Sequence, residues 1–377
     1  MTATSTSTEL ADTTSAAAAP SIVRYSGRRL PLRLALQGGG AHGAYTWGVL
    51  DALLESARFD IDHISGTSAG AMNAVVLAQG WTAALAAGRS PEEGARDALQ
   101  RFWHAVAKQA PVDWGGIHGD AAEPALSPAT RLLMQWSQLL SPYQLNPLAR
   151  NPLRDLLAEQ VDFELLSTSC PITLHLAATH ANTGRLKLFG NQPGHGPLTV
   201  DAAMASACLP TLQAAVVIDG EPYWDGGYSA NPPLLPLVHG AGACDVLIVM
   251  LAPLTWGDTP TKAADIRGRA VELAFNAAFV REAQLLAAFT PTVGTAHGWL
   301  VKLTRTLLPI AVPVGAPRWH LIDADLGHLP SETKLIARRD FFDHLRDMGR
   351  ARAQDWLVHD AGKVGRLSSV DLGELLA

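Results

Sequence analysis

QGGGAHGAY, residues 37–45, is the most informative motif of this chain, with four glycines in seven residues. It follows a short apolar run at residues 33–36 and precedes apolar side chains at helical spacing over residues 44–54. This order predicts a strand, a glycine loop and a helix, as in α/β proteins. Because glycines let a ligand approach the backbone closely, the N–H groups of the loop can donate hydrogen bonds to an anion.

A second motif, GTSAG at residues 66–70, places Ser68 between Gly66 and Gly70. Residues 59–65 alternate apolar and polar side chains and predict a strand, and residues 69–79 predict a helix of small residues. Ser68 is therefore expected on a strand-to-helix turn, where its hydroxyl can act as a nucleophile. The alternative is a serine that only caps the following helix.

The glycine loop supplies the candidate oxyanion hole, the backbone N–H groups of Gly38, Gly39, Gly40 and Ala41. With Gly43, the loop also matches the Gly-x-Gly-x-x-Gly fingerprint of dinucleotide-binding proteins. That fingerprint expects an acidic residue at the end of the second strand. Here Asp60 and Asp62 open that strand instead, which argues against a nucleotide site.

Asp225 is the candidate general base. A hairpin is predicted around the Asp-Gly pair at residues 219–220, and the chain leaves it directly into Asp225-Gly226-Gly227. A carboxylate can accept the proton of a serine hydroxyl, and a site poor in water raises its basicity. The alternative is an aspartate that only stabilises a turn.

A Ser-His-Asp triad is the rival mechanism, since thirteen histidines offer possible bases. In α/β-hydrolases several strands precede the nucleophile, whereas one strand and a glycine loop precede Ser68, which argues against the triad. His42 is poorly placed to bridge Ser68 to a distant acid. The histidines lack spacing of the His-Glu-x-x-His type, so we expect no metal site.

Composition limits the class of protein. The 377 residues are 48% hydrophobic and 17% charged, which predicts a large core with a smaller appendage. The net charge is −6 without a basic run, so we expect no nucleic-acid partner and no simple electrostatic docking to membranes. No apolar run is long enough to span a bilayer. The spacing of Cys170, Cys208 and Cys244 fits free thiols in a reducing cytoplasm.

The motifs at residues 37–43, 66–70 and 225–227 resemble, in order and context, the three signature blocks of patatin-like phospholipases. The resemblance covers about residues 32–253 and continues through Asn231-Pro232-Pro233. It implies a three-layer α/β/α fold with a mainly parallel sheet, and a dyad of Ser68 and Asp225 that needs no cofactor. Gly43, Gly66, Gly70, Gly226 and Gly227 would support these motifs.

Two residues depart from the plant pattern, which resembles Asp-Gly-Gly-Gly followed by arginine. This chain has Gln37 before the glycines and His42 after them. The backbone donors are kept, but a histidine is only fractionally charged at neutral pH, so cationic help beside the oxyanion is in question.

We expect a disordered tail over residues 1–30, a catalytic domain over 31–255 with a helical insertion at 91–157, and a mainly helical extension over 256–377 packed on that domain. Four aromatic residues of the insertion could line an acyl pocket, although packing on the core is the default interpretation: Trp103, Trp114, Trp136 and Tyr143.

The function expected from these residues is hydrolysis of lipid or other acyl esters through an acyl-Ser68 intermediate, in a protein that is cytoplasmic and in possible peripheral contact with a membrane. The alternative is a catalytically silent lipid-binding or regulatory module on the same scaffold. Such a module would be expected to have lost the nucleophile or the acid, and both are present.

Overall fold

The structure is a computed structural model that describes residues 22, 24–109, 116–137, 139–148, 150–240, 242–255, 259–289 and 316–375. Most of the predicted N-terminal tail and Trp114 lie outside the described residues.

A central sheet organises the described part of the chain, which forms nine strands of this sheet in the order β11-β10-β1-β2-β5-β6-β7, with the hairpin β8–β9 attached to β5. The five strands from β11 to β5 are parallel, whereas β6 and β9 run antiparallel to β5. The strands are β1 (Leu30–Leu36), β2 (Phe59–Thr67), β5 (Thr173–His180), β6 (Leu186–Gly190), β7 (Gly196–Pro197), β8 (Val216–Ile218), β9 (Glu221–Asp225), β10 (Asp245–Met250) and β11 (Arg318–Asp323).

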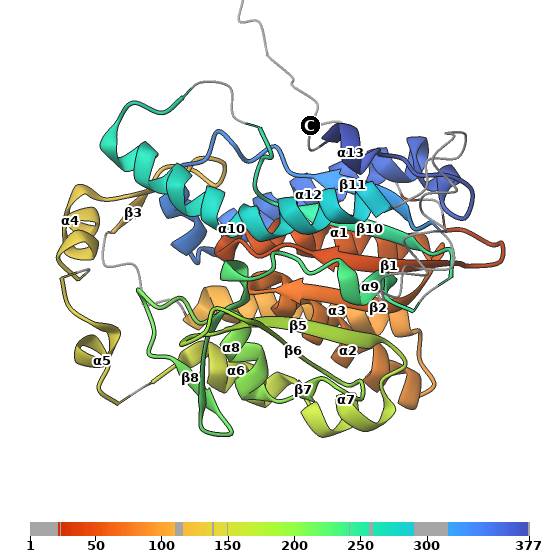
Figure 1. The fold of residues 1–377 in the computed structure, drawn as a ribbon, viewed down its shortest axis with the longest axis horizontal. Coiled ribbons are helices and arrows are strands. Elements are labelled where there is room, and N and C mark those ends of the chain that lie inside the picture. The colour runs from red at the N-terminus through yellow and green to blue at the C-terminus, as the bar shows by residue number, and fades with distance from the viewer. Residues whose placement is uncertain are drawn as a thin grey trace, which may run out of the picture.

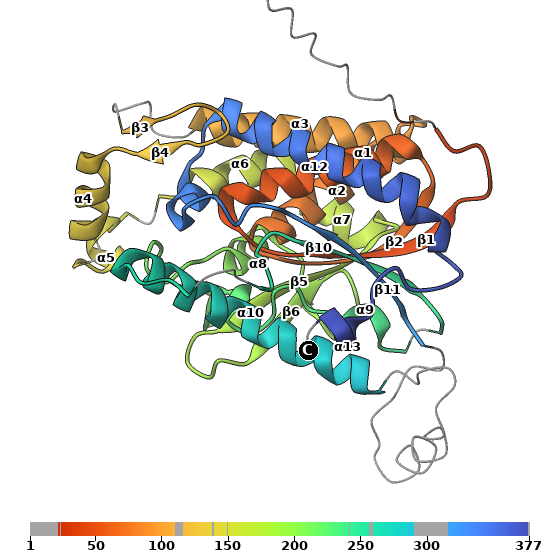
Figure 2. The ribbon, with the colours of Figure 1, turned by 90° about the horizontal axis from the view of Figure 1, so that it is seen from above.

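Helices cover both faces of the sheet (Figures 1 and 2). Above it in Figure 2 lie α1 (Gly43–Ser56), α2 (Ala69–Ala86), α3 (Pro91–Gln109) and α12 (Arg339–His359), and below it lie α9 (Leu235–Val238), α10 (Ala263–Phe289) and α13 (Leu372–Leu375). Both faces of strand β10 are apolar and need a cover. Leu247 and Val249 belong to the core under α1, α2, α3 and α12, whereas Val246 and Ile248 belong to the core on the side of α9, α10 and α13. This alternation, with every residue of β10 buried, confirms the three-layer α/β/α prediction.

The insertion contains α4 (Pro128–Ser137), α5 (Pro142–Leu145), α6 (Pro152–Gln160) and the small hairpin of β3 (Ile117–His118) and β4 (Ala125–Leu126). The chain returns to the sheet through α7 (Phe163–Ser169). Helix α8 (Val200–Ser206) follows the β5–β6 hairpin and the short strand β7. The described residues include no helix both long and apolar enough to cross a bilayer.

Strand β11 was not predicted from the sequence. It lies in the extension that was expected to be mainly helical, and it adds a parallel edge strand beside β10. Arg318 and His320 interrupt its apolar pattern, which concealed the strand. Both bond to the buried Asp245, at 2.7 Å and 3.0 Å, so this edge accommodates polar residues through a partner from another strand.

Candidate active site

Ser68 lies on the predicted strand-to-helix turn, between the end of β2 and the start of α2. Its backbone has φ 54° and ψ −121°, a conformation that a residue other than glycine adopts only under strain. The Ser68 N–H donates to Ser206 Oγ of α8 at 3.0 Å, which helps hold the turn. Ser68 occupies the N-cap position of α2, but its side chain makes no capping hydrogen bond to the helix.

The glycine loop contacts this turn directly. A Cβ atom added to Gly38 would lie 2.8 Å from both Ser68 Cβ and Thr67 O, and one added to Gly70 would lie 2.2 Å from Leu36 O. Atoms do not approach this closely, so only glycine lets the first loop and the Ser68 turn pack together. The two motifs of the sequence therefore form one site.

Three buried amide side chains fix the glycine loop. Gln37 Oε1 accepts the N–H groups of Leu251 and Ala252 at 2.6 Å and 2.9 Å, and Gln37 Nε2 donates to Asn276 Oδ1 at 3.0 Å. Asn231 Oδ1 accepts the Gly38 N–H at 2.7 Å. Gln37, a departure from the plant pattern, thus ties the loop to the end of β10 and to α10.

These bonds distinguish the N–H groups of the loop. The Gly38 N–H already has Asn231 as its acceptor, whereas no acceptor from the described residues faces the N–H groups of Gly39 and Gly40. Gly40 has φ 58°, and the following turn η1 (Gly40–His42) leads into α1. The N–H group of Ala41 has no acceptor among the described residues either, so Gly39, Gly40 and Ala41 are the loop residues whose N–H groups remain for a ligand.

Asp225 ends strand β9, where its side chain is buried with a residue exposure of 1%. Its N–H donates to Cys208 O at 2.8 Å, and its Oδ1 accepts the Gly227 N–H at 2.7 Å. Burial raises the pKa of Asp225 to about 7, against the hydrogen bonds from the Gly227 N–H and the Ser68 hydroxyl, which lower the pKa. A carboxyl group with this pKa exchanges protons near neutral pH.

The Ser68 hydroxyl lies close enough to lower the pKa of Asp225, yet Asp225 Oδ2 accepts no hydrogen bond of regular geometry. The bond from Gly227 is typical of a turn aspartate, the alternative interpretation. Asp225 nevertheless differs from an ordinary turn aspartate in being buried. Asp219, by contrast, is exposed in the turn of the same hairpin, with φ 52°.

His42 does not contribute a cation. Its ring is buried and its Nε2 bonds to Thr333 Oγ1 at 2.8 Å in η3 (Ser331–Leu335). Burial lowers the pKa of His42 to about 3, with smaller contributions from Lys334 and His328. Among the described residues no histidine hydrogen-bonds to Ser68 or to Asp225, so the structure gives no support to a Ser-His-Asp triad.

The extension after residue 255 also contributes to the site, which the sequence did not reveal. Besides Asn276, helix α10 brings Phe275 against Gly227 and against the ring of Tyr228, at a centroid distance of 4.7 Å. No local pattern marks Asn276 or Phe275. Asn231 could have been found, because it opens the Asn-Pro-Pro motif.

The aromatic residues of the insertion separate into two groups. Trp103 is buried against Phe342 and donates to Asn73 Oδ1 at 2.9 Å, so it packs in the core. Trp136 and Tyr143 are largely exposed, and the default interpretation of core packing is wrong for both.

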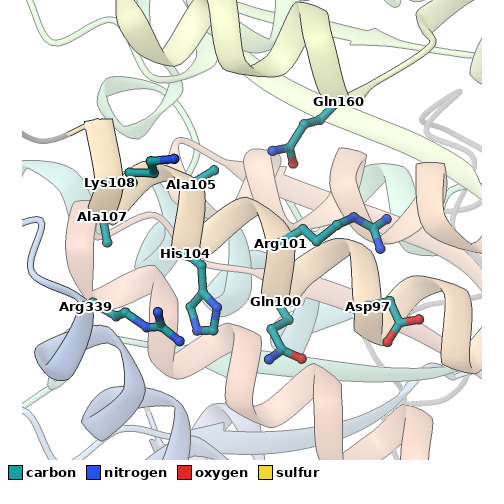
Figure 3. Close-up of a pocket in the computed structure, with 9 residues that line it drawn as sticks. All are labelled: Asp97, Gln100, Arg101, His104, Ala105, Ala107, Lys108, Gln160 and Arg339. Atoms are coloured by element: carbon teal, nitrogen blue, oxygen red, sulfur yellow. The ribbon is translucent and has the colours of Figure 1, made fainter.

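A groove of about 690 Å³ runs over the outer surface of α3 (Figure 3). Its side chains are mostly polar and charged, and include Arg101, Lys108 and Arg339. None of the residues of the candidate site lines it. In the described residues, no three His, Cys, Asp or Glu side chains are grouped so as to hold a metal ion.

A family model described as patatin-like phospholipase matches residues 34–238, which is more than half of the chain and runs from β1 to α9. The match includes Ser68, Asp225 and Asn231. No curated protein matches the chain in sequence.

Among solved structures, VipD from Legionella pneumophila is 14% identical with a TM-score of 0.36, and the alignment covers 87% of this chain and 68% of VipD. ExoU in its complex with SpcU, from the type III secretion system of Pseudomonas aeruginosa, is 18% identical with a TM-score of 0.34, covering 90% and 52%. A second structure of the effector ExoU gives 18% identity and a TM-score of 0.33, covering 88% and 53%. The chain spans about half the length of the two ExoU chains.

Proposed function

Because this chain belongs to the patatin-like phospholipase family, we propose that it hydrolyses carboxylic esters of lipids, with Ser68 as nucleophile and Asp225 as general base. One observation carries the proposal. Ser68 occupies a strained turn in contact with Gly38, beside a fully buried carboxyl group whose pKa is about 7. A base with a pKa near the working pH is suited to both accepting and returning a proton.

In the acylation step, Ser68 Oγ attacks the ester carbonyl carbon and its proton passes to Asp225 Oδ2, which has no other hydrogen-bond partner. The negative charge develops on the carbonyl oxygen. The N–H groups of Gly39, Gly40 and Ala41 would stabilise it, with the start of α2 adding a favourable dipole. Collapse of the intermediate breaks the ester C–O bond, and the alcohol leaves with the proton from Asp225.

In the deacylation step, water attacks the acyl-Ser68 carbonyl and transfers a proton to Asp225. The intermediate then releases the fatty acid, and the proton returns to Ser68 Oγ. Of the four residues that the sequence predicted for the oxyanion hole, the proposal keeps Gly39, Gly40 and Ala41 and omits Gly38. Gly38 has a different role here, since its N–H bonds to Asn231 and its lack of a side chain lets Ser68 approach.

A fluorophosphonate probe tests the proposal, because it reacts covalently with an activated serine. We expect peptide mass spectrometry of the wild type to find the label on Ser68, and labelling of Asp225→Asn to be slower by orders of magnitude. Ser68→Ala is the control for the site of attachment. Equal labelling of wild type and Asp225→Asn would contradict the dyad, and absence of labelling would favour the catalytically silent module.

A further inference from the structure

The segment of α4 and α5 carries exposed apolar side chains that we call the apolar patch. Each is between 47% and 77% exposed: Leu132, Leu133, Trp136, Leu139, Leu140, Tyr143, Leu145 and Leu148. Leu132, Leu133 and Trp136 have the spacing of one helix face. A soluble surface seldom presents so many large apolar side chains together, and such a patch marks an interaction site.

Two contacts attach this segment to the elements on either side of Ser68. Arg131 makes a bidentate ion pair with Glu332 of η3, at 2.9 Å and 3.0 Å from Nε, and the next residue of η3 binds His42. Tyr143 Oη accepts the N–H of Ala215 at 3.2 Å, in the connection from α8 to β8. The segment therefore bridges the glycine-loop side of the site and the side that leads to Asp225.

The views agree with this placement. α4 and α5 lie at one end of the molecule, the same end toward which β1 runs and at which α10 begins (Figures 1 and 2). The carboxyl ends of β1 and β2, and with them the glycine loop and Ser68, face this end. An object that covered the apolar patch would therefore lie beside the candidate active site.

The charge of the segment indicates which kind of surface would cover the apolar patch. Residues 124–154 contain three arginines and no Asp or Glu, in a chain whose net charge is −6. Arg131 and Arg154 pair with the partly exposed carboxylates of Glu332 and Asp201, whereas Arg150 is exposed next to the patch. Anionic lipid surfaces attract arginine and repel carboxylates, and tryptophan and tyrosine are enriched where proteins meet lipid headgroups.

We propose that the apolar patch docks this chain onto an anionic lipid surface, so that Ser68 meets its ester at the edge of that surface. The proposal rests on the proposed function, because it names where the lipid substrate is met. The leucines and Trp136 enter the boundary between headgroups and acyl chains, and Arg150 lies against the headgroup phosphates.

Vesicle sedimentation tests this docking. The probes are vesicles of phosphatidylcholine alone and of equimolar phosphatidylcholine and phosphatidylglycerol. We expect the wild type to bind the mixed vesicles, Trp136→Glu/Leu139→Glu to bind at least about tenfold more weakly, and Arg150→Ala to bind them about fivefold more weakly. Val358→Glu is the matched control, because Val358 is 76% exposed at the end of α12, and it should bind as the wild type does.

Hydrolysis of a short, water-soluble ester separates docking from chemistry. Trp136→Glu/Leu139→Glu should hydrolyse this ester at the wild-type rate, which also shows that the variant is folded, and should lose activity only on esters within vesicles. Absence of wild-type binding to vesicles, or equal binding by this variant, would overturn the docking proposal. So would a wild-type dimer that the variant dissociates, since the patch would then join two copies. A wild type that binds vesicles but hydrolyses neither ester supports the docking and contradicts the proposed function instead.

Discussion

Replacing Asp225 by asparagine should remove activity and, at alkaline pH, stabilise the fold. Burial raises the pKa of Asp225 from 3.8 to about 7, so between these values the folded chain holds a proton that the unfolded chain has released. The free energy of unfolding therefore falls as the pH rises through this interval. The total is about 4 kcal/mol, at about 1.4 kcal/mol per pH unit over the interval.

Asparagine removes this dependence because it stays neutral at every pH. Its Oδ1 can still accept the Gly227 N–H. Its Nδ2 would replace Asp225 Oδ2, which has no regular partner, and a buried NH₂ group without an acceptor lowers the free energy of unfolding by about 1–3 kcal/mol. We expect the variant to be about 1–3 kcal/mol more stable than the wild type at roughly pH 8.5, and less stable at roughly pH 4, where the wild-type carboxyl is also neutral.

Urea unfolding followed by circular dichroism at both pH values measures the two differences. Asp219→Asn is the control, because Asp219 lies in the exposed turn of the same hairpin and asparagine tolerates its positive φ. The control is measured against the wild type at the same two pH values. A stability difference between Asp225→Asn and the wild type that is the same at both pH values would refute a raised pKa at Asp225. For the same reason, kcat/KM of the wild type should rise with pH around a midpoint near 7.

Four further substitutions test the site. Ser68→Ala should abolish ester turnover with an unchanged circular dichroism spectrum, and residual turnover above about one part in a thousand would point to another nucleophile. Asn231→Ala frees the Gly38 N–H and should lower kcat about 10- to 100-fold with little change in KM; an unchanged kcat in steady-state assays would mean that the loop holds its shape without Asn231. Gly39→Val should lower kcat about 100-fold because it disturbs a proposed oxyanion donor, whereas an equal rise in KM would indicate that the new side chain only blocks the pocket. His42→Gln should leave the shape of the pH–rate profile unchanged between about pH 5 and 9, because the pKa of His42 is about 3, and a shifted profile would show that its charge matters.

The sequence determined the local parts of the site. Glycine has few steric limits, and the strand and helix patterns on either side of residues 37–45 and 66–70 leave only a turn between them, so both turns were predicted at their observed places. The same holds for the hairpin, whose Asp219 and Gly220 have φ 52° and 83°. The order of these motifs also indicated the family, because each motif is continuous in the chain.

Tertiary structure decided what depends on distant partners. Gln37 bonds to Asn276 across 239 residues, and Gly38 bonds to Asn231 across 193, so no local pattern could assign these residues to the loop. Strand β11 was concealed because its polar residues are satisfied only by Asp245 of another strand. The exposure of Trp136 was likewise hidden, since an apolar residue at helical spacing has the same pattern whether its helix packs on the core or faces outward. The local sequence therefore limits which backbone conformations each turn can adopt. The pKa of Asp225 and the shape of the glycine loop are set instead by burial and by long-range hydrogen bonds. They could not be predicted because they depend on which groups the fold brings together and removes from water.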